Sequence, residues 1–294
     1  ARLFAGSGPA AFTYRTLGSL LLLGVAPLLA GWWLGLYLAP QPAVGIIRLN
    51  TDIWAGSAEL VMDQIEAARA DPSVKAIVLQ LNTPGGEVTA TQVLYLELQS
   101  LRKEMPVVGS IDGLAASGGY YMAMATDPIY AKPSSTVGNV GVWGFVPPDL
   151  GVNEVILASG PFKLTASNRA EFLRRIESIK REFLETVFSQ RGERLEISRV
   201  DLSQGLAYSG REALRWGLID HLGSQAEAIA SAAELAGIVQ YEVIDLQARV
   251  IHELSEGNQA FLEAWVGAAD PVTGRRILPP GAYLLYDFRL GGAP

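Results

Sequence analysis

The chain contains no cysteine and only two histidines among its 294 residues. The lack of cysteine excludes disulfides, thiolate metal sites and a cysteine nucleophile. Because His221 and His252 are the only histidines, a histidine-based metal site is not expected, and we predict neither a metal nor a cofactor. Lysine and arginine form no run, and the formal net charge is -7 at pH 7. The sequence therefore lacks the basic patch that binding to nucleic acid requires.

One uncharged stretch is long enough to cross a membrane. Residues 17–39 are rich in leucine and contain no charged side chain. As a helix they reach about 35 Å, against a hydrocarbon core of about 30 Å. A cleavable signal peptide is the alternative, but its apolar region usually has about 7 to 15 residues. Arg2 and Arg15 precede the stretch. They favour a cytoplasmic N-terminus, hence a single-pass protein of the cell membrane whose main domain is extracytoplasmic.

After Pro42 the chain alternates short apolar runs with longer amphipathic ones, a pattern typical of an α/β fold. The short runs predict strands, and the longer ones between them predict helices. We expect strands at 44–49, 76–81, 106–111 and 240–246, and helices at 58–70, 88–103 and 167–190. Strand, helix and strand in this order predict parallel pairing, which places functional loops at the carboxyl ends of the strands.

The same patterns divide the chain into four parts. We expect a short cytoplasmic N-terminus (1–16), the membrane anchor (17–39), the main domain (43–248), and a C-terminal helix with an extended tail (249–294). Capping boxes at Ser209 with Glu212 and at Ser224 with Glu227 predict two further helix starts. Within the tail, we expect residues 283–288 to dock on another protomer or on another part of the surface.

Ser117 lies among small residues in the segment 113–121, directly after the third expected strand. A strand that ends in a small-residue turn and continues as a helix places the turn at a helix N-terminus. Free N–H groups there favour developing negative charge, which suits a nucleophilic serine. The nonapeptide alone is equally compatible with a turn that serves only close packing of strand and helix.

A nucleophilic serine needs a base, because an alcohol is a weak nucleophile at neutral pH. Both histidines lie far downstream and fit surface or capping positions. The contexts of four of the five lysines argue against a base: Lys75 precedes a strand, Lys103 ends a charged helix, Lys132 precedes proline, and Lys180 is expected on the polar side of its helix. Lys163 remains, in an uncharged segment where burial would favour the neutral amine. An ordinary exposed loop lysine is the alternative.

Acylation of a serine also needs N–H donors for the oxyanion, and glycine turns supply them without a side chain in the way. Gly86 follows the second expected strand and Gly118 follows Ser117. Adjacent parallel strands would bring both turns to one crevice. The alternative is that 84–86 forms a simple turn.

Taken together, five segments resemble the signal peptide peptidase A family of membrane-anchored serine peptidases over residues 44–246. They are Asn82–Gly86, Ala116–Tyr121, Gly138–Val142, Ser159–Lys163, and a C-terminal signature made up of Ala207–Ala213, Gly217–Asp220 and Leu222–Gly223. The resemblance implies a Clp protease/crotonase-like fold of repeated strand-strand-helix units. It further implies Ser117 as nucleophile, Lys163 as general base and the Gly86 and Gly118 amides as oxyanion hole. It also implies a ring-shaped homo-oligomer in the membrane, in which a neighbour's lysine can complete the dyad.

Asn139 departs from the family pattern, which usually has serine at this position to orient the lysine amine. An amide can take over that role or impair the base, and we expect Asn139→Ser to leave activity equal or higher. Two functions follow. The first is a serine endopeptidase that hydrolyses hydrophobic peptides such as remnant signal peptides. The second is a catalytically impaired scaffold or accessory subunit of a membrane protein complex. Acyl-CoA chemistry is disfavoured, since we find no acidic residue beside the glycine turns that would serve as its base.

Overall fold

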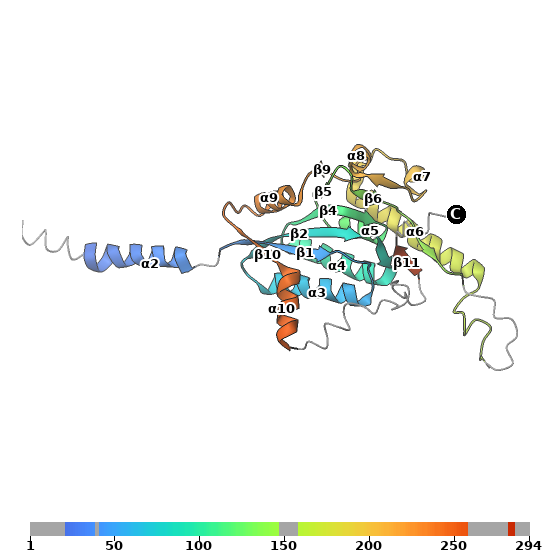
Figure 1. The fold of residues 1–294 in the computed structure, drawn as a ribbon, viewed down its shortest axis with the longest axis horizontal. Coiled ribbons are helices and arrows are strands. Elements are labelled where there is room, and N and C mark those ends of the chain that lie inside the picture. The colour runs from blue at the N-terminus through green and yellow to red at the C-terminus, as the bar shows by residue number, and fades with distance from the viewer. Residues whose placement is uncertain (1–20, 39–40, 147–157, 258–281, 286–294) are drawn as a thin grey trace, which may run out of the picture. The chain divides into compact units, whose positions relative to one another are not determined.

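The structure, a computed structural model, describes residues 21–38, 41–146, 158–257 and 282–285 (Figure 1). The chain divides into two compact units, residues 1–41 and 42–294. In the first unit, a π-helical turn at Leu21–Val25 leads into helix α2 (Ala26–Leu38). No helix among the described residues has both the length and the apolar character needed to cross a membrane. The predicted anchor, 17–39, begins and ends outside the described residues, so it stays a prediction.

A parallel sheet forms the centre of the second unit. Its strand order is β10 (Glu242–Asp245), β1 (Ala43–Leu49), β2 (Val74–Thr83), β4 (Val107–Ala116), β5 (Ile129–Ala131) and β9 (His221–Leu222), and each neighbouring pair is parallel. The short strand β6 (Thr136–Gly138) pairs in parallel with the end of β4, at Leu114–Ala116, and antiparallel with β8 (Ala207–Ser209). The four expected strands and their parallel pairing are confirmed. The mixed α/β class follows from this arrangement.

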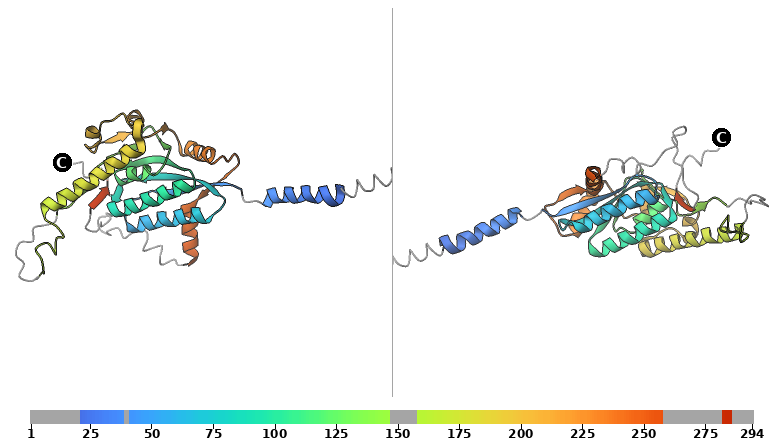
Figure 2. Two further views of the ribbon diagram at one scale, coloured as in Figure 1. Left: turned by 180° about the vertical axis from the view of Figure 1, so that it is seen from behind. Right: turned by 90° about the horizontal axis from the view of Figure 1, so that it is seen from below.

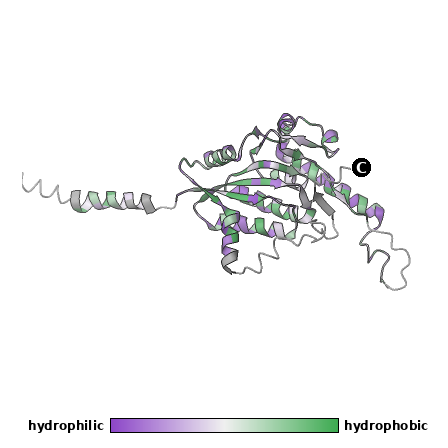
Figure 3. Cartoon of the chain, viewed as in Figure 1, coloured by the Kyte–Doolittle hydropathy of each residue, from purple (hydrophilic) through white to green (hydrophobic). Residues whose placement is uncertain are grey.

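Helices cover both faces of the sheet, which explains the apolar runs within its central strands, such as 76–79 of β2 (Figure 3). On one face α3 (Ala55–Ala70) and α4 (Val88–Glu104) lie side by side, and Ile77 and Leu79 of β2 belong to that core (Figure 2). On the other face α9 (Gln225–Leu235) packs over Ala76 and Val78. Helix α10 (Leu246–Gly257) packs against α3 and β1.

Local signals fix the remaining helices. Asn168 caps the long helix α6 (Arg169–Arg191) by accepting from the Glu171 backbone N–H at 2.8 Å. The predicted capping boxes are confirmed at Ser209, which begins α8 (Gly210–Arg215), and at Ser224, which begins α9. The other short elements are α5 (Gly118–Ala123), a 3-10 turn (Gly192–Arg194) and α7 (Arg199–Leu202).

A buried ion pair fastens the end of α6 to the sheet. The Arg191 guanidinium donates to both carboxylate oxygens of Asp220, at 2.8 and 2.9 Å, and its Nε donates to the Gly217 carbonyl. Asp220 also accepts from the Ile129 backbone N–H, at the start of β5. Burial raises the pKa of Asp220, but the bonds and charge of Arg191 outweigh it and hold the pKa below its usual range.

A second, small sheet contains part of the C-terminal tail. Strand β11 (Ala282–Leu285) lies between β3 (Gly85–Glu87) and β7 (Trp143–Gly144) and pairs antiparallel with both. Of the two docking places expected for 283–288, the structure shows the surface of the same chain, for residues 283–285. Residues 286–288 lie outside the described part. The tail thus occupies a gap between two strands that would otherwise each present a free edge there.

Candidate active site

Ser117 occupies the junction between β4 and α5, as the strand-turn-helix pattern predicted. It is the N-cap residue of α5 and has φ 52° and ψ -120°. Serine rarely adopts this conformation, and such backbone strain is concentrated at functional sites. The Ser117 N–H donates to the Gly138 carbonyl at 2.8 Å, so β6 holds the strained residue in place. Ser117 is only 2% exposed.

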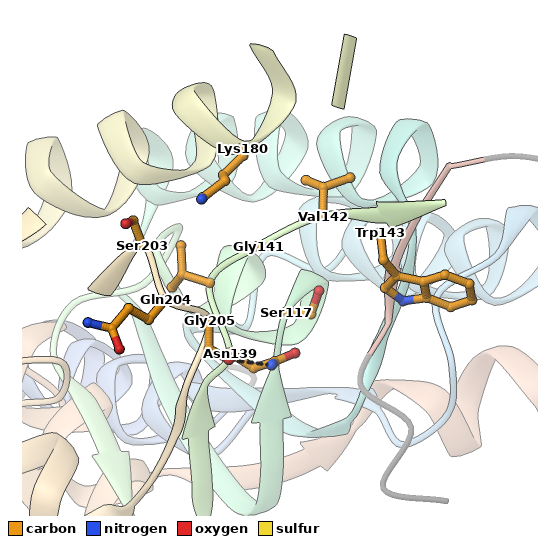
Figure 4. Close-up of a pocket in the computed structure, with 10 residues that line it drawn as sticks. Ser117, Asn139, Gly141, Val142, Trp143, Lys180, Ser203, Gln204 and Gly205 are labelled. Atoms are coloured by element: carbon orange, nitrogen blue, oxygen red, sulfur yellow. Dashed lines mark hydrogen bonds between the residues drawn. The ribbon is translucent and has the colours of Figure 1, made fainter. Parts of the chain in front are cut away.

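A pocket of about 280 Å³ opens beside Ser117 (Figure 4). Its walls come from the end of β6, the segment leading into β7, helix α6 and the turn after α7. The lining residues are Ser117, Asn139, Val140, Gly141, Val142, Trp143, Lys180, Ser203, Gln204 and Gly205. Only one of these ten carries a charge, the cation Lys180, and none is acidic. The pocket is therefore a polar cavity with a positive bias next to a candidate nucleophile.

Gly86 faces the gap that β11 fills. The Ile53 N–H donates to the Gly85 carbonyl, and the Glu87 N–H donates to the Ile53 carbonyl. In such a parallel bridge the N–H and C=O of the middle residue point the opposite way. The Gly86 N–H therefore points away from Ile53 and toward β11, where Leu284 is its register partner. A Cβ on Gly86 would lie 1.9 Å from the Ile53 carbonyl oxygen, so only glycine fits.

Gly118 is the first residue of α5, and its N–H is among those that a helix leaves without an intrahelical acceptor. The next residue, Gly119, lets α5 approach the end of β2, because a Cβ there would lie 2.8 Å from the Thr83 carbonyl oxygen. The two predicted oxyanion donors thus come from the segments that directly follow β2 and β4, which pair as neighbouring strands. Their role at an oxyanion stays a prediction.

Lys163 is placed apart from Ser117 in this chain. It lies on an exposed turn before α6, where its N–H donates to the Gly160 carbonyl at 3.1 Å. It does not line the Ser117 pocket. Within the part of the chain that the structure describes, its side chain makes no ion pair or hydrogen bond. A single chain therefore does not bring the two dyad residues to one pocket, and the dyad stays a prediction.

Lys180 was expected on the polar side of α6, and the structure shows that this expectation is wrong. It is half-buried and lines the Ser117 pocket. The signal was present in the sequence, since residues three, four and seven positions apart share one helix face. Phe183 and Val187, at the third and seventh positions after Lys180, are both fully buried. A helical projection centred on these two residues would have found Lys180 on the inward face.

Asn139 lines the pocket, but its side chain is engaged in holding the wall together. Its Nδ2 donates to the Gly205 carbonyl at 2.7 Å, and its backbone N–H donates to the Leu206 carbonyl at 2.9 Å. With φ 53°, Asn139 lies in the left-handed region, which asparagine tolerates better than most residues. One N–H of the amide is thus already used, and the side-chain oxygen and the second N–H are the groups left for orienting a base.

The two histidines and Tyr121 are not placed or charged so as to act as a base at this site. Neither histidine lines the pocket, and His221 instead packs on Tyr130 with ring centroids 4.7 Å apart. Burial raises the pKa of Tyr121 to about 12, so its phenol keeps its proton at neutral pH. In the described ranges, no three histidine or acidic side chains are grouped so as to hold a metal ion.

The fold and the pocket define a mixed α/β protein with a serine held at a strained strand-to-helix junction, an arrangement suited to serine hydrolases. Comparison with known proteins gives the family. Residues 99–239 match peptidase family S49, and residues 43–144 match the N-terminal domain of NfeD1b. These matches and the relatives below support the SppA-type peptidases of family S49 as the family of this chain, and its sheet is consistent with the Clp protease/crotonase fold.

Three curated relatives illustrate the match. Protease 4 of Salmonella typhi is 35% identical over 61% of this chain and 31% of its own length. A putative protease of Methanocaldococcus jannaschii is 30% identical over 63% of each protein. A putative signal peptide peptidase SppA of Enterococcus faecium is 24% identical over 70% of this chain and 62% of its own length. The chain thus spans about a third of the first relative and just under two thirds of the other two.

Proposed function

We propose that this chain is a serine endopeptidase in which Ser117 is the nucleophile and Lys163 the general base. One observation carries the proposal: a buried serine with a strained backbone sits at the start of a helix and opens into a pocket. The match to peptidase family S49 and the names of the relatives support peptide hydrolysis as the reaction. The relatives named as proteases and the chemistry suggested by the site thus point to the same class of reaction.

In the proposed reaction, the Ser117 hydroxyl attacks the carbonyl carbon of a peptide bond while a neutral lysine amine takes its proton. The negative charge that develops on the carbonyl oxygen is stabilised by the N–H groups of Gly118 and Gly86. The lysine then protonates the leaving amine, and water hydrolyses the acyl-enzyme. The outward orientation of the Gly86 N–H supports its role, because that N–H faces the gap between β3 and β7.

The same gap suggests how a peptide binds. Strand β11 lies there with its backbone paired to β3 on one side and β7 on the other. An extended peptide in its place would add as a strand and be held by main-chain hydrogen bonds. Hydrophobic peptides such as remnant signal peptides are the substrates we propose, in keeping with the signal peptide peptidase named among the relatives.

Lys163 reaches a nucleophile in this proposal only across an interface between protomers. Its exposed position, away from the Ser117 pocket of its own chain, supports a dyad that forms between neighbours in a ring-shaped homo-oligomer. Burial at such an interface would also remove water from the amine, which favours its neutral form. We further propose that 17–39 anchors the ring in the cell membrane, with the N-terminus cytoplasmic and the main domain extracytoplasmic.

The decisive experiment uses two inactive variants. Ser117→Ala and Lys163→Ala should each abolish hydrolysis of a fluorogenic hydrophobic peptide while circular dichroism and thermal unfolding remain as in the parent. Hydrolysis retained by either variant refutes the dyad. Lys103→Ala, which removes an exposed lysine far from the pocket, is the matched control and should keep full activity.

Mixing the two inactive variants tests where the dyad forms. Co-assembled Ser117→Ala and Lys163→Ala protomers restore activity if one protomer supplies serine and its neighbour supplies lysine. A dyad within one chain leaves every mixture inactive. Light scattering after size-exclusion chromatography reports whether the chain forms a closed oligomer at all.

A non-catalytic scaffold remains the second candidate, because Lys163 lies outside the Ser117 pocket and the Asn139 amide is bound to Gly205. A serine-reactive phosphonate separates the two candidates. An active peptidase is labelled at Ser117, whereas a scaffold with no activated serine is not.

A further inference from the structure

The Ser117 pocket contains the ammonium group of Lys180. Lys180 lines it, is half-buried, and forms no ion pair with any described residue. Figure 4 shows it extending from α6 toward the side of Ser203 and Gln204, with Ser117 on the other side of the pocket. Losing water around an ammonium group costs free energy unless an anion or hydrogen-bond acceptor replaces it. A ligand with a negative group would make that replacement.

The acidic residues around the pocket do not fill this role. None of the lining residues is acidic. Asp201 accepts a hydrogen bond from the lining residue Gln204, but it also accepts from Ser198 and does not itself line the pocket. Glu177, one turn before Lys180 on α6, is exposed and makes no ion pair with it in the described structure. Among the described residues, none neutralises the Lys180 charge, which is therefore available to a ligand.

The direction of β11 indicates which end of a peptide would reach this charge. Ala282 pairs with Gly144 and Tyr283 pairs with Trp143 in an antiparallel register. A strand of this polarity therefore advances, from its N- to its C-terminal end, along β7 toward Val142 and Gly141. Those two residues line the Ser117 pocket. A peptide bound like β11 thus carries its C-terminal end into the pocket that contains Lys180.

We propose that Lys180 binds the C-terminal carboxylate of the peptide substrate. A carboxylate is the natural partner of an ammonium group, and a charge-assisted hydrogen bond in a partly buried pocket is stronger than a neutral one. An acidic side chain offers the same chemistry, but the strand polarity favours the chain end. Ser117 then lies close to the anchored end, and cleavage releases short C-terminal fragments. The inference rests on the proposed function only in requiring that peptides bind in this pocket.

The test measures binding without turnover. Full-length chain carrying Ser117→Ala is titrated with a fluorescein-labelled hydrophobic hexapeptide that ends in a free carboxylate, and with the same peptide ending in an amide. Fluorescence anisotropy gives the two dissociation constants. We expect the acid to bind at least about tenfold more tightly than the amide, equivalent to about 1.4 kcal/mol. A second pair, with an internal glutamate or glutamine and an amidated end, measures the contribution of an acidic side chain.

Three further variants in the Ser117→Ala background assign the preference to Lys180. Lys180→Gln should bring acid and amide to within about twofold, and Lys180→Arg should retain the preference for the acid. Arg181→Gln removes a positive charge from the next, exposed position of α6 and should leave the preference unchanged. The acid and the amide are compared on each variant. A general loss of fold or of peptide affinity therefore changes both dissociation constants alike and leaves their ratio unchanged.

Equal affinity for acid and amide overturns the inference, as does a preference that survives Lys180→Gln or a Lys180-dependent preference for internal glutamate alone. The proposed function fails by a different result, namely hydrolysis that persists in Ser117→Ala. An active chain that binds acid and amide equally keeps the proposed function and loses the carboxylate anchor.

Discussion

The Asn139 side chain donates from Nδ2 to the Gly205 carbonyl oxygen at 2.7 Å, and this bond joins the end of β6 to the turn after α7. Both residues line the Ser117 pocket, and Asn139 follows Gly138, whose carbonyl accepts from the Ser117 N–H. The asparagine at this position therefore has a structural role that serine could not fill in the same way. Its amide bridges two walls of the pocket while its backbone adopts φ 53°.

Replacing this residue tests that role. Asn139→Ser removes the bridge to Gly205 and places serine in the left-handed region. We expect the free energy of unfolding to fall by about 1–3 kcal/mol, from the lost hydrogen bond together with backbone strain. Asn139→Gly, which relieves the strain but still lacks the bridge, should lose less. Urea unfolding measures both variants. A serine variant as stable as the parent contradicts the structural role, and the expected equal or higher peptidase activity is assayed separately.

Gly86 offers a sharper steric test. In Gly86→Ala the new methyl group would meet the Ile53 carbonyl oxygen at 1.9 Å, so β3 must shift. We expect a loss of about 1–3 kcal/mol in stability and of about 100-fold in peptide hydrolysis, because the N–H that we propose as an oxyanion donor moves with the strand. Gly160→Ala adds a methyl group in open space and controls for stability. Full activity in Gly86→Ala would show that its N–H is not an oxyanion donor.

The contrast between Ser117 and Lys180 shows what the sequence can predict. Periodicity gave the parallel strands, and capping boxes gave the starts of α8 and α9, because those signals are local. Ser117 was found because a strand, small residues and a helix follow one another directly. Lys180 was missed because its isolated charge suggested solvent, although its helical spacing to Phe183 and Val187 indicated the core.

Local sequence patterns do not encode which strands pair when those strands are far apart in the chain. Strand β11 follows β3 by almost two hundred residues, and nothing in the sequence of Ala282–Leu285 predicts that it pairs with Gly85–Glu87. The separation of Lys163 from the Ser117 pocket likewise depends on how α6 leaves the sheet, which no motif encodes. Motif order identified the residue types of the site, whereas their meeting within one chain or between two depends on tertiary and quaternary structure.

The buried pair of Arg191 and Asp220 predicts how stability depends on pH. The pKa of Asp220 in the folded state lies below the unfolded value of about 3.9. The stabilisation is therefore fully present above pH 4 and is lost as the pH falls through the folded pKa. Asp220→Asn leaves the Arg191 charge buried without its partner, which should cost about 3–5 kcal/mol at pH 7. It should also flatten the acid limb of the stability curve.

A surface pair provides the control for that measurement. Glu253 forms an exposed pair with Arg249, and Glu253→Gln should change stability by less than about 1 kcal/mol. Urea midpoints recorded from pH 3 to 7 compare the variants with the parent. An Asp220→Asn curve parallel to that of the parent at low pH would show that another carboxylate governs the acid transition.

The position of β11 leads to a prediction about substrate affinity. Since this strand occupies the gap between β3 and β7, a peptide that binds there must displace it. The apparent affinity for peptide is then reduced by the fraction of molecules in which the gap is occupied. Deleting residues 258–294 should lower KM for a hydrophobic peptide by about tenfold or more if β11 is bound in most molecules, with little change in kcat.

A point substitution separates the strand from the rest of the tail. Leu284→Pro removes a backbone N–H from the middle strand of the small sheet, where proline is not tolerated, and keeps the chain at full length. It should lower KM as the deletion does, because only the pairing with β3 and β7 is lost. If KM is unchanged in both variants, β11 does not compete with substrate. A rise in KM in both variants would mean that β11 helps to hold the peptide. The peptide and β11 would then be bound at the same time rather than in competition.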